Sequence, residues 1–484
     1  MGLKQKTVTG FIWTSAGMLG NGFMSFLVTL ILARILMPYH FALVELLLIF
    51  LAISNVIVDS GFSQAIIRDD NPSEKDLSSV FYFNIVLSFT IYICLFFTAP
   101  YISNYFDAPE LKLLSRVVFL VIIFNSFSII QNATLNRNLN FAAVNKSSVI
   151  GSFLAGTISI IMAFTGFGIW ALVANMVLLP FFRSILLWYH SSWRPIKSFS
   201  IISVKKYFAF GGFLMVQGVI DAISTNLVSL LIGKTYTKND LGYFSQGRKL
   251  DGYIVTPFNS IIQKVTYPIL SKIKNEESRL KEGYRKIVGV VMFVFIPVMF
   301  FTIGTSENMI ITLFGEKWAE AGVYLKIASI GSLLFPLQNV CTNIIMIKGK
   351  TNVMLIYSFI KHGIRIILLL AFIKSGVLAL AIVFSVSTLI GSLLFILPGM
   401  KYIKYNISEL FIDLYKTVTA ALVSLIPVVF IDTYLLEQNT ILVFSLQAIS
   451  MCVVYLVVSK LFRNEYLTES ISMVNPLILK IKNR

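Results

Sequence analysis

The sequence predicts an all-α integral membrane protein with about 14 transmembrane helices. Hydrophobic residues make up 57% of the 484-residue chain, and the mean hydropathy is +0.82, whereas soluble domains are roughly 45–50% apolar. Long apolar runs recur throughout, each close to the roughly 20 residues that a helix needs to cross the hydrocarbon layer. Only 13% of residues are charged, yet the net charge is +17, so the basic excess must lie away from lipid-facing surfaces.

The first apolar run follows Lys4 and Lys6 and is longer than the roughly 7–15-residue core of a signal peptide, which predicts an uncleaved membrane helix. Later apolar runs predict the remaining spans. The weakest is 250–270, which Asp251, Asn259 and Lys264 interrupt, and such a helix is better suited beside water. The predicted spans are 8–33, 41–61, 79–101, 111–131, 147–166, 168–189, 207–233, 250–270, 287–305, 322–346, 353–373, 377–398, 415–433 and 440–460.

Basic residues lie unevenly on the two sides of these spans. With the N-terminus inside, 26 of the 40 Lys and Arg residues fall in inward segments and 8 in outward loops. Because basic loops stay in the cytoplasm, both termini are expected there. The outward loops are short, which leaves no room for an extracytoplasmic catalytic domain.

One polar stripe occurs twice, two hundred positions apart. Four-residue spacing places three polar residues on one face of the first helix, and the same offsets recur in 207–233. The two sets are Asn21, Ser25 and Thr29, and Asp221, Thr225 and Ser229. This pattern predicts two halves with a polar seam.

Further matches extend the repeat. Gln131 corresponds to Gln338, and Gly168 corresponds to Gly376 at the start of similar segments. Six helices separate the copies, and an even number predicts parallel repeats related by an axis along the membrane normal. The expected division is 1–190 as N-lobe (spans 1–6), 191–206 as cytoplasmic linker and hinge, 207–400 as C-lobe (spans 7–12), and 401–484 as spans 13–14 with a cytoplasmic tail.

The sequence contains no signature of hydrolytic or nucleotide chemistry. It has neither a phosphate-binding Gly-Lys-Ser/Thr loop nor a His-Glu-x-x-His motif. The three His residues have no ligand spacing, and the three Cys residues lie in apolar runs, so neither a metal nor disulfides are expected. The prediction is a transporter with no cofactor, powered by a proton or sodium gradient, the membrane potential or the substrate gradient.

The most informative residues are ionisable ones inside apolar segments, since a charge at bilayer depth costs roughly 2.5–3.5 kcal/mol. Lys264, Lys361 and Arg365 lie near mid-segment, and the last two share a helix face. Such a face is expected to border water or an anion. Asp221 is the counter-charge, either in a structural ion pair with Lys264 or Lys361, or as a switchable partner that substrate or a proton displaces.

Five other charged residues have two open interpretations. Arg116 lies close enough to a helix end for its stem to reach the interface, or it belongs to a gate. Glu45 and Asp59 are gate or cap residues at opposite ends of one span. Arg34 and Lys234, on equivalent outward hairpins, are interface anchors or gate cations.

Together these residues predict a cavity for an anionic, hydroxyl-rich cargo. Cations hold phosphate or pyrophosphate, Arg by paired hydrogen bonds and Lys as a point charge. Amide and hydroxyl side chains both donate to and accept from sugar hydroxyls. The predicted cavity residues are Asn21, Ser25, Gln217, Asp221, Thr225, Asn226, Lys264, Lys361 and Arg365.

Four stretches resemble Wzx-type polysaccharide exporters, the lipopolysaccharide biosynthesis proteins of the multidrug/oligosaccharidyl-lipid/polysaccharide superfamily. They are residues 32–43, 60–65, 135–141 and 166–173. Ala42 stands where that family usually has Gly, whereas Gly242 is kept in the second half. The resemblance implies two six-helix lobes in a V around a central cationic cavity, with two additional C-terminal helices.

The resemblance also implies a function. It is the translocation of undecaprenyl-pyrophosphate-linked oligosaccharide from the inner to the outer leaflet of the bacterial plasma membrane by alternating access, for O-antigen, capsule or exopolysaccharide assembly. The implied partners are that lipid-linked substrate, membrane lipids, a polysaccharide polymerase and glycosyltransferases, without nucleic acid. The family supplies no short motif to map, so the site residues rest on the physical argument above.

Two other classes of protein remain as alternatives. An ion-coupled multidrug or cation antiporter of the same superfamily needs buried carboxylates, whereas here mid-segment cations outnumber acids. A membrane polymerase or ligase needs a large outward loop, which the sequence lacks.

Overall fold

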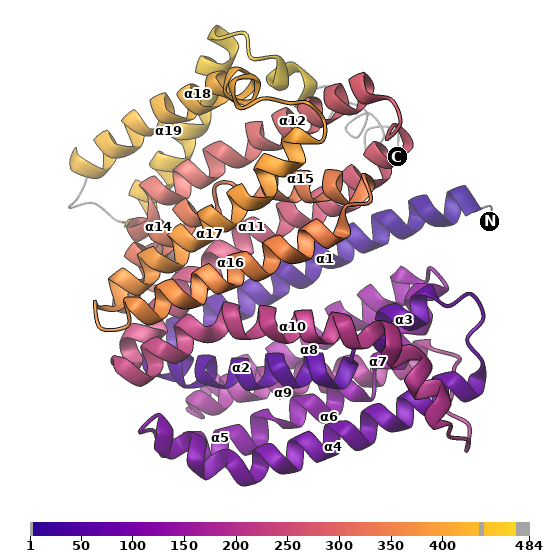
Figure 1. The fold of residues 1–484 in the computed structure, drawn as a ribbon. Helices are drawn as coiled ribbons and strands as arrows, with labels where there is room; N and C mark the ends of the chain where they lie inside the picture. Colours follow the sequence, from indigo (N-terminus) through magenta and orange to yellow (C-terminus); the bar gives the residue numbers. More distant parts are fainter. Residues whose placement is uncertain (1–2, 435–439, 471–484) are drawn as a thin grey trace, which may run out of the picture. The chain divides into compact units, whose positions relative to one another are not determined.

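The computed structural model describes residues 3–434 and 440–470, with only the backbone course for 3–16, 18–19, 264–265 and 351. Every regular element in these ranges is a helix (Figure 1). Twelve helical segments of the described chain are long and apolar enough to cross a membrane, which confirms the all-α membrane fold. The total of about fourteen spans stays a prediction, and the long helices outside those twelve are α1 (Leu3–Ile35) and α11 (Lys238–Lys272).

The chain divides into two compact units, Met1–Ser245 and Gln246–Arg484. The boundary falls inside α11. Besides α1, the first unit contains α2 (Pro38–Asp59), α3 (Phe62–Arg68), α4 (Glu74–Tyr105), α5 (Leu111–Val118), α6 (Leu120–Ser126), α7 (Ile129–Arg137), α8 (Phe141–Phe164), α9 (Ile169–His190) and α10 (Ile201–Thr235).

Close backbone contact holds α10 within the first unit. Ser60 and Gly61 end α2 in left-handed conformations, with φ of 47° and 70°, and this turn lies directly on α10 at Gly211. A Cβ on Gly61 would come within 2.6 Å of the Gly211 Cα, so only glycines allow the approach. This packing differs from the division predicted from the sequence, which assigns 207–233 to the second lobe.

The expected hinge, 191–206, is also attached to the first unit. The backbone N–H of Ile196 donates to Ser78 Oγ at 3.0 Å, and that of Ser200 donates to Ser79 Oγ at 2.8 Å. Trp193 is 7% exposed and packs in an apolar cluster with residues such as Phe81. The segment is therefore tied to the start of α4 along its length.

The second unit is built mainly from long helices around one apolar cluster, which includes Leu280, Phe295 and Ile344. Its elements after α11 are α12 (Glu277–Gly304), α13 (Ser306–Phe314), η1 (Glu316–Trp318), α14 (Ala321–Ser332), α15 (Phe335–Ile347), α16 (Thr351–Ala371), α17 (Val377–Lys401), α18 (Ile407–Tyr434) and α19 (Thr440–Leu461). Helices α18 and α19 pack on each other, and α18 packs on α12.

The two units repeat the same construction. Each has one broken span, Leu111–Arg137 and Ala321–Ile347, followed by two long helices. Gly168 and Gly376 precede the second of these helices with positive φ of 55° and 100°, which favours glycine. The matched residues of the predicted repeat therefore occupy matched structural positions.

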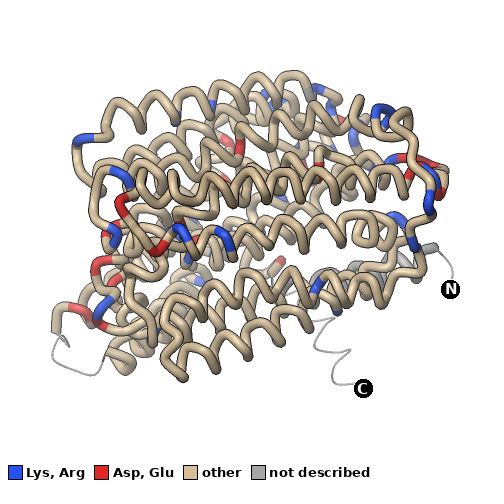
Figure 2. The backbone as a smooth tube through the Cα atoms, turned by 90° about the horizontal axis from the view of Figure 1, so that it is seen from below, with Lys and Arg blue, Asp and Glu red and all other residues tan. Residues whose placement is uncertain are grey.

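A buried glutamine follows the break in each of these spans. It is hydrogen-bonded to the second of the two long helices that come after the broken span. Gln338 accepts from Ser392 of α17 at 2.8 Å. With its amide oriented to satisfy both neighbours, Gln131 accepts from Trp188 Nε1 of α9 at 3.2 Å and donates to the Phe127 carbonyl at 2.7 Å. Charged residues lie mostly toward the ends of the long helices (Figure 2). The few charged residues in the middle of a helix are therefore candidates for a function.

Candidate functional site

The polar stripe of α1 contributes to packing inside the first unit. Asn21 accepts a hydrogen bond from Ser152 of α8 at 2.5 Å. Thr29 is buried and Ser25 is half-buried. The stripe thus joins α1 to α8 at one end, and its role in a substrate cavity stays a prediction.

The matching stripe of α10 also lies in the first unit. Ser229 donates to Glu45 of α2 at 2.9 Å, and Asn226 donates to a carbonyl of its own helix at 2.8 Å. Thr225 is exposed, while Gln217 and Asp221 are half-buried. The predicted pairing of Asp221 with Lys264 or Lys361 would join different units, and it stays a prediction.

Three of the secondary candidates have local partners. Asp59 accepts from the Ser63 hydroxyl at 2.5 Å and from its N–H at 3.2 Å, at the start of α3. Lys234 is 3.0 Å from the Asp107 carboxylate, and the Arg116 guanidinium lies 4.2 Å from the centre of the Phe96 ring. These contacts favour cap, anchor and packing roles, and Arg34 is exposed.

The second unit contains a buried arginine in the middle of a membrane helix. Arg365 of α16 is 5% exposed. It donates to Ser387 Oγ at 3.2 Å and to Thr388 Oγ1 at 2.9 Å, and it lies 4.5 Å from the centre of the Phe384 ring. These α17 contacts fix the plane of the guanidinium, and a fixed guanidinium is suited to binding an oxyanion by two hydrogen bonds.

Lys361 lies one turn before Arg365 and extends along α17. A Cβ at Gly391 would come within 2.7 Å of the Lys361 Cγ, so the glycine makes room for the lysine stem. The backbone of Lys264 is helical, but its side chain lies outside the described part of the chain.

Arg248 of α11 is a further cation, and it lies just before the span predicted at 250–270. Its guanidinium lies 5.6 Å from the centre of the same Phe384 ring that Arg365 contacts. Two arginines from separate helices therefore share one aromatic ring. Arg248 lies within the continuous helix Lys238–Lys272. The span predicted from the sequence began only at residue 250 and therefore did not include it.

Asp251, three residues further, is a buried carboxylate. It is 6% exposed and accepts hydrogen bonds from Ser329 at 3.1 Å and Ser332 at 2.7 Å, both on α14. The sequence analysis noted Asp251 only as an interruption of an apolar run. The available signal in the sequence was a carboxylate one helical turn after a glycine, Gly247. In the structure the backbone at Gly247 packs directly on the backbone of α14.

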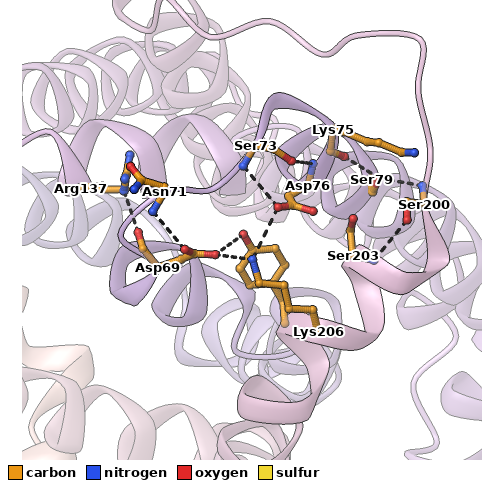
Figure 3. Close-up of polar contacts among 11 residues, drawn as sticks. Asp69, Asn71, Ser73, Lys75, Asp76, Ser79, Arg137, Ser200, Ser203 and Lys206 are labelled. Atoms are coloured by element: carbon orange, nitrogen blue, oxygen red, sulfur yellow. Dashed lines mark hydrogen bonds and ion pairs between the residues drawn. The ribbon is translucent and has the colours of Figure 1, made fainter.

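A second polar cluster lies at one end of the first unit, between α3, α4, α7 and α10 (Figure 3). Asp69 accepts from Lys206 at 2.7 Å and from the Tyr207 hydroxyl at 2.8 Å, and Lys206 is 3.6 Å from Asp76. The hydrogen bond from Lys206, then that from Tyr207, holds the pKa of Asp69 below its ordinary value. A cavity of about 230 Å³ adjoins this cluster and is lined by Ala65, Arg68, Asp69, Lys206, Tyr207 and Phe210.

No group of three or more His, Cys, Asp or Glu residues in the described chain is arranged to hold a metal ion. The second unit supplies the buried Arg365 with the half-buried Lys361 and Arg248, and the helices α1 and α10 supply amides and hydroxyls. These groups can take part in recognition by charge and hydrogen bonding.

The sequence profile of a family described as "Polysaccharide biosynthesis protein" matches residues 31–323. Among similar proteins, the teichuronic acid biosynthesis protein TuaB of Bacillus subtilis (strain 168) is 26% identical over 62% of this chain and 62% of its own length. The match thus spans less than two thirds of that relative. The lipopolysaccharide biosynthesis protein WzxC of Escherichia coli (strain K12) is 23% identical over 75% of this chain and 74% of its own.

The solved structure of the lipid II flippase MurJ in an inward closed conformation is similar to this fold. It superposes with a TM-score of 0.75 at 17% identity and covers 94% of this chain and 99% of that one. At this identity the similarity establishes the fold.

Proposed function

Because the chain belongs to the polysaccharide biosynthesis protein family, we propose that it is a flippase for lipid-linked oligosaccharides. Its cargo is an undecaprenyl-pyrophosphate-linked repeat unit, which it moves from the inner to the outer leaflet of the bacterial plasma membrane by alternating access. The product serves the assembly of a surface polysaccharide. The chain is thus a Wzx-type member of its superfamily, as the resemblance in the sequence indicates.

The observation that carries this proposal is Arg365. A guanidinium that is 5% exposed within a membrane helix is costly, and the Ser387 and Thr388 hydroxyls hold it in one orientation. A diphosphate matches the charge and the planar donors of an arginine held in this way. In this proposal Arg365 and Arg248, which share the Phe384 ring, bind the diphosphate together with Lys361.

The polar residues of α1 and α10 have a separate role in the proposal. Asn21, Gln217, Asp221 and Thr225 exchange hydrogen bonds with sugar hydroxyls. The polyprenyl chain stays in lipid. Both termini lie in the cytoplasm, and a proton or sodium gradient supplies the energy. Glycosyltransferases act before transport, and a polymerase acts after it. The antiporter alternative is not favoured, because the named relatives serve polysaccharide biosynthesis.

The test is complementation in cells that lack the native copy. We expect Lys361→Ala with Arg365→Ala to lower surface polysaccharide about tenfold or more at normal protein levels, since each lost charge-assisted contact is worth about 1.5–3 kcal/mol. Arg365→Lys keeps the charge but loses the planar donors, so we expect an intermediate level.

The matched control is Arg279→Ala, which removes an arginine paired with Glu276 at an exposed position. It is expected to leave the polysaccharide level unchanged. A double variant of Lys361 and Arg365 that supports wild-type levels would contradict the proposed role of these cations.

A further inference from the structure

We propose that Asp251 is the proton-binding group of this transporter, and that its protonation controls how α11 packs on α14. The link to transport rests on the proposed function, whereas the proton site rests on local geometry. The carboxylate is 6% exposed. Its partners in the described chain are two neutral hydroxyls, Ser329 at 3.1 Å and Ser332 at 2.7 Å, and no ion pair joins it there.

A buried carboxylate with neutral donors alone is balanced between two states. In a dry contact the ionised form loses its hydration, and two serine hydrogen bonds replace only part of it. If α11 and α14 separate and admit water, the ionised form regains hydration. The dry contact therefore binds a proton more tightly than the hydrated one, and by linkage proton binding favours the dry contact.

Within the described chain, the charged neighbours of Asp251 along α11 are the cations Arg248 and Lys249, with Tyr253 just beyond it and Asp240 eleven residues before it. The titratable and charged groups of α14 are Tyr324 and Lys326, and those of α16 are Tyr357, Lys361, His362 and Arg365. Helix α13 contributes Glu307, which packs on Gly322 of α14. Helix α17 carries only Lys401, α15 only Cys341, and those of α12 are Glu277, Arg279, Lys281, Glu282, Tyr284, Arg285 and Lys286, at its start. A transient positive charge nearby, such as Arg248 turning from Phe384, would promote release of the proton.

The contact fits a proton better than a metal cation. The site has four oxygen atoms, two from the carboxylate and two from the serines, and both hydroxyls already donate to the carboxylate. A metal ion would have to turn both hydroxyls around and find further oxygen ligands. A proton needs only one carboxylate oxygen.

The contact between α11 and α14 is also close enough for a small change at Asp251 to alter the packing of the two helices. One turn before Asp251, a Cβ at Gly247 would come within 2.7 Å of both the Ala321 carbonyl and the Leu325 nitrogen. The α11 backbone thus lies directly on α14, with no side chain between them. A change in the bonds of Asp251 therefore acts on the packing of the two helices.

The experiment measures hydrogen exchange of the α14 segment Ala321–Ser332 in the full-length protein in lipid nanodiscs, between about pH 5 and 9. After correction for intrinsic exchange, we expect protection in the wild type to fall about tenfold as pH rises. Asp251→Asn, which keeps the shape without a titratable proton, should remove this dependence. Ser329→Ala with Ser332→Ala keeps the carboxylate but removes its donors, and should move the midpoint to higher pH.

The matched control is Asp432→Asn. Asp432 of α18 is also held by neutral donors, Asn308 at 2.6 Å and Gln447 at 3.2 Å, and its variant should keep the wild-type pH dependence. A pH dependence that survives in Asp251→Asn, or protection that responds to sodium instead of pH, would overturn the proton site.

A second measurement separates this inference from the proposed function. Vesicles with an imposed pH gradient are tested for movement of a labelled undecaprenyl-pyrophosphate-linked oligosaccharide. If lipid movement depends on the pH gradient in the wild type and does not depend on it in Asp251→Asn, the result supports both the flippase function and the proton site. A pH-dependent α14 with no lipid movement contradicts the flippase, while movement equally gradient-dependent in both proteins contradicts the role of Asp251.

Discussion

The two units use one helix arrangement, and the second unit adds a buried carboxylate to it. In the first unit a neutral pair joins the second helix to the broken span, Asn125 of α6 donating to Asn55 of α2 at 3.0 Å. In the second unit Asn339 of α15 donates to Asn259 of α11, which is again a neutral pair, and α11 also carries the ionisable Asp251 against α14. The repeated fold has thus kept a neutral pair in both units and added a carboxylate in the second.

The helix that follows each repeat shows a second difference. Helix α10 packs on the first unit through the backbone contact at Gly61 and Gly211, together with the exposed ion pairs of Lys206 with Asp69 and of Lys234 with Asp107. Helix α18 packs on the second unit through ion pairs, including Arg285 with Asp413 and Lys281 with Glu409. Ion pairs therefore join this helix to its unit in both cases, and the first unit adds a direct backbone contact at Gly61 and Gly211.

The most disruptive change expected is Gly211→Leu. A side chain there meets the backbone of Ser60 and Gly61, which cannot move aside, so the cost is about 3 kcal/mol. We expect a lower thermal midpoint in detergent and easier proteolysis of α10. Gly212→Leu is the control, because its nearest neighbour is the Phe208 ring of the same helix at 3.1 Å; equal losses in both variants would remove the shape argument.

Asp413→Ala is expected to have the next largest effect. Asp413 accepts from Arg285 at 2.8 and 2.5 Å and from Tyr405 at 2.6 Å, and its side chain is 8% exposed. Because Arg285 is partly solvated, we expect a loss of about 2 kcal/mol, measured as the thermal midpoint. Glu277→Gln breaks the exposed pair with Lys404 and should change nothing measurable; a similar loss in both would show that burial is not what matters.

Asp69→Asn is expected to have the smallest effect. The pair with Lys206 is half-exposed on the lysine side, so its contribution is below about 1 kcal/mol. Because the pKa of Asp69 is lowered in the folded protein, this stability is present above about pH 4 and is lost as pH falls through the folded pKa. Thermal midpoints from neutral to acid pH should fall less in Asp69→Asn, and parallel curves would contradict the assignment.

The sequence predicted the all-helical membrane class and the repeat because apolar length and matched motifs are local properties. The equivalence of Gly168 with Gly376 is an example, since each glycine is required by its own turn. The unit to which α10 belongs was not predictable, because it depends on Gly61 meeting Gly211 across 150 residues. For a similar reason the sequence showed Asp251 only as an interruption of the apolar run 250–270. Its partners on α14 are 78 and 81 residues away.

The attachment of 191–206 to α4 has a consequence for synthesis of the chain. Ser78 and Ser79 find their partners only when Ile196 and Ser200 have been made, and the first unit closes at Ser245. A nascent chain that ends after the sixth span therefore still lacks a helix that its own unit requires. The first unit becomes complete only after translation has passed Ser245, well beyond the sixth span.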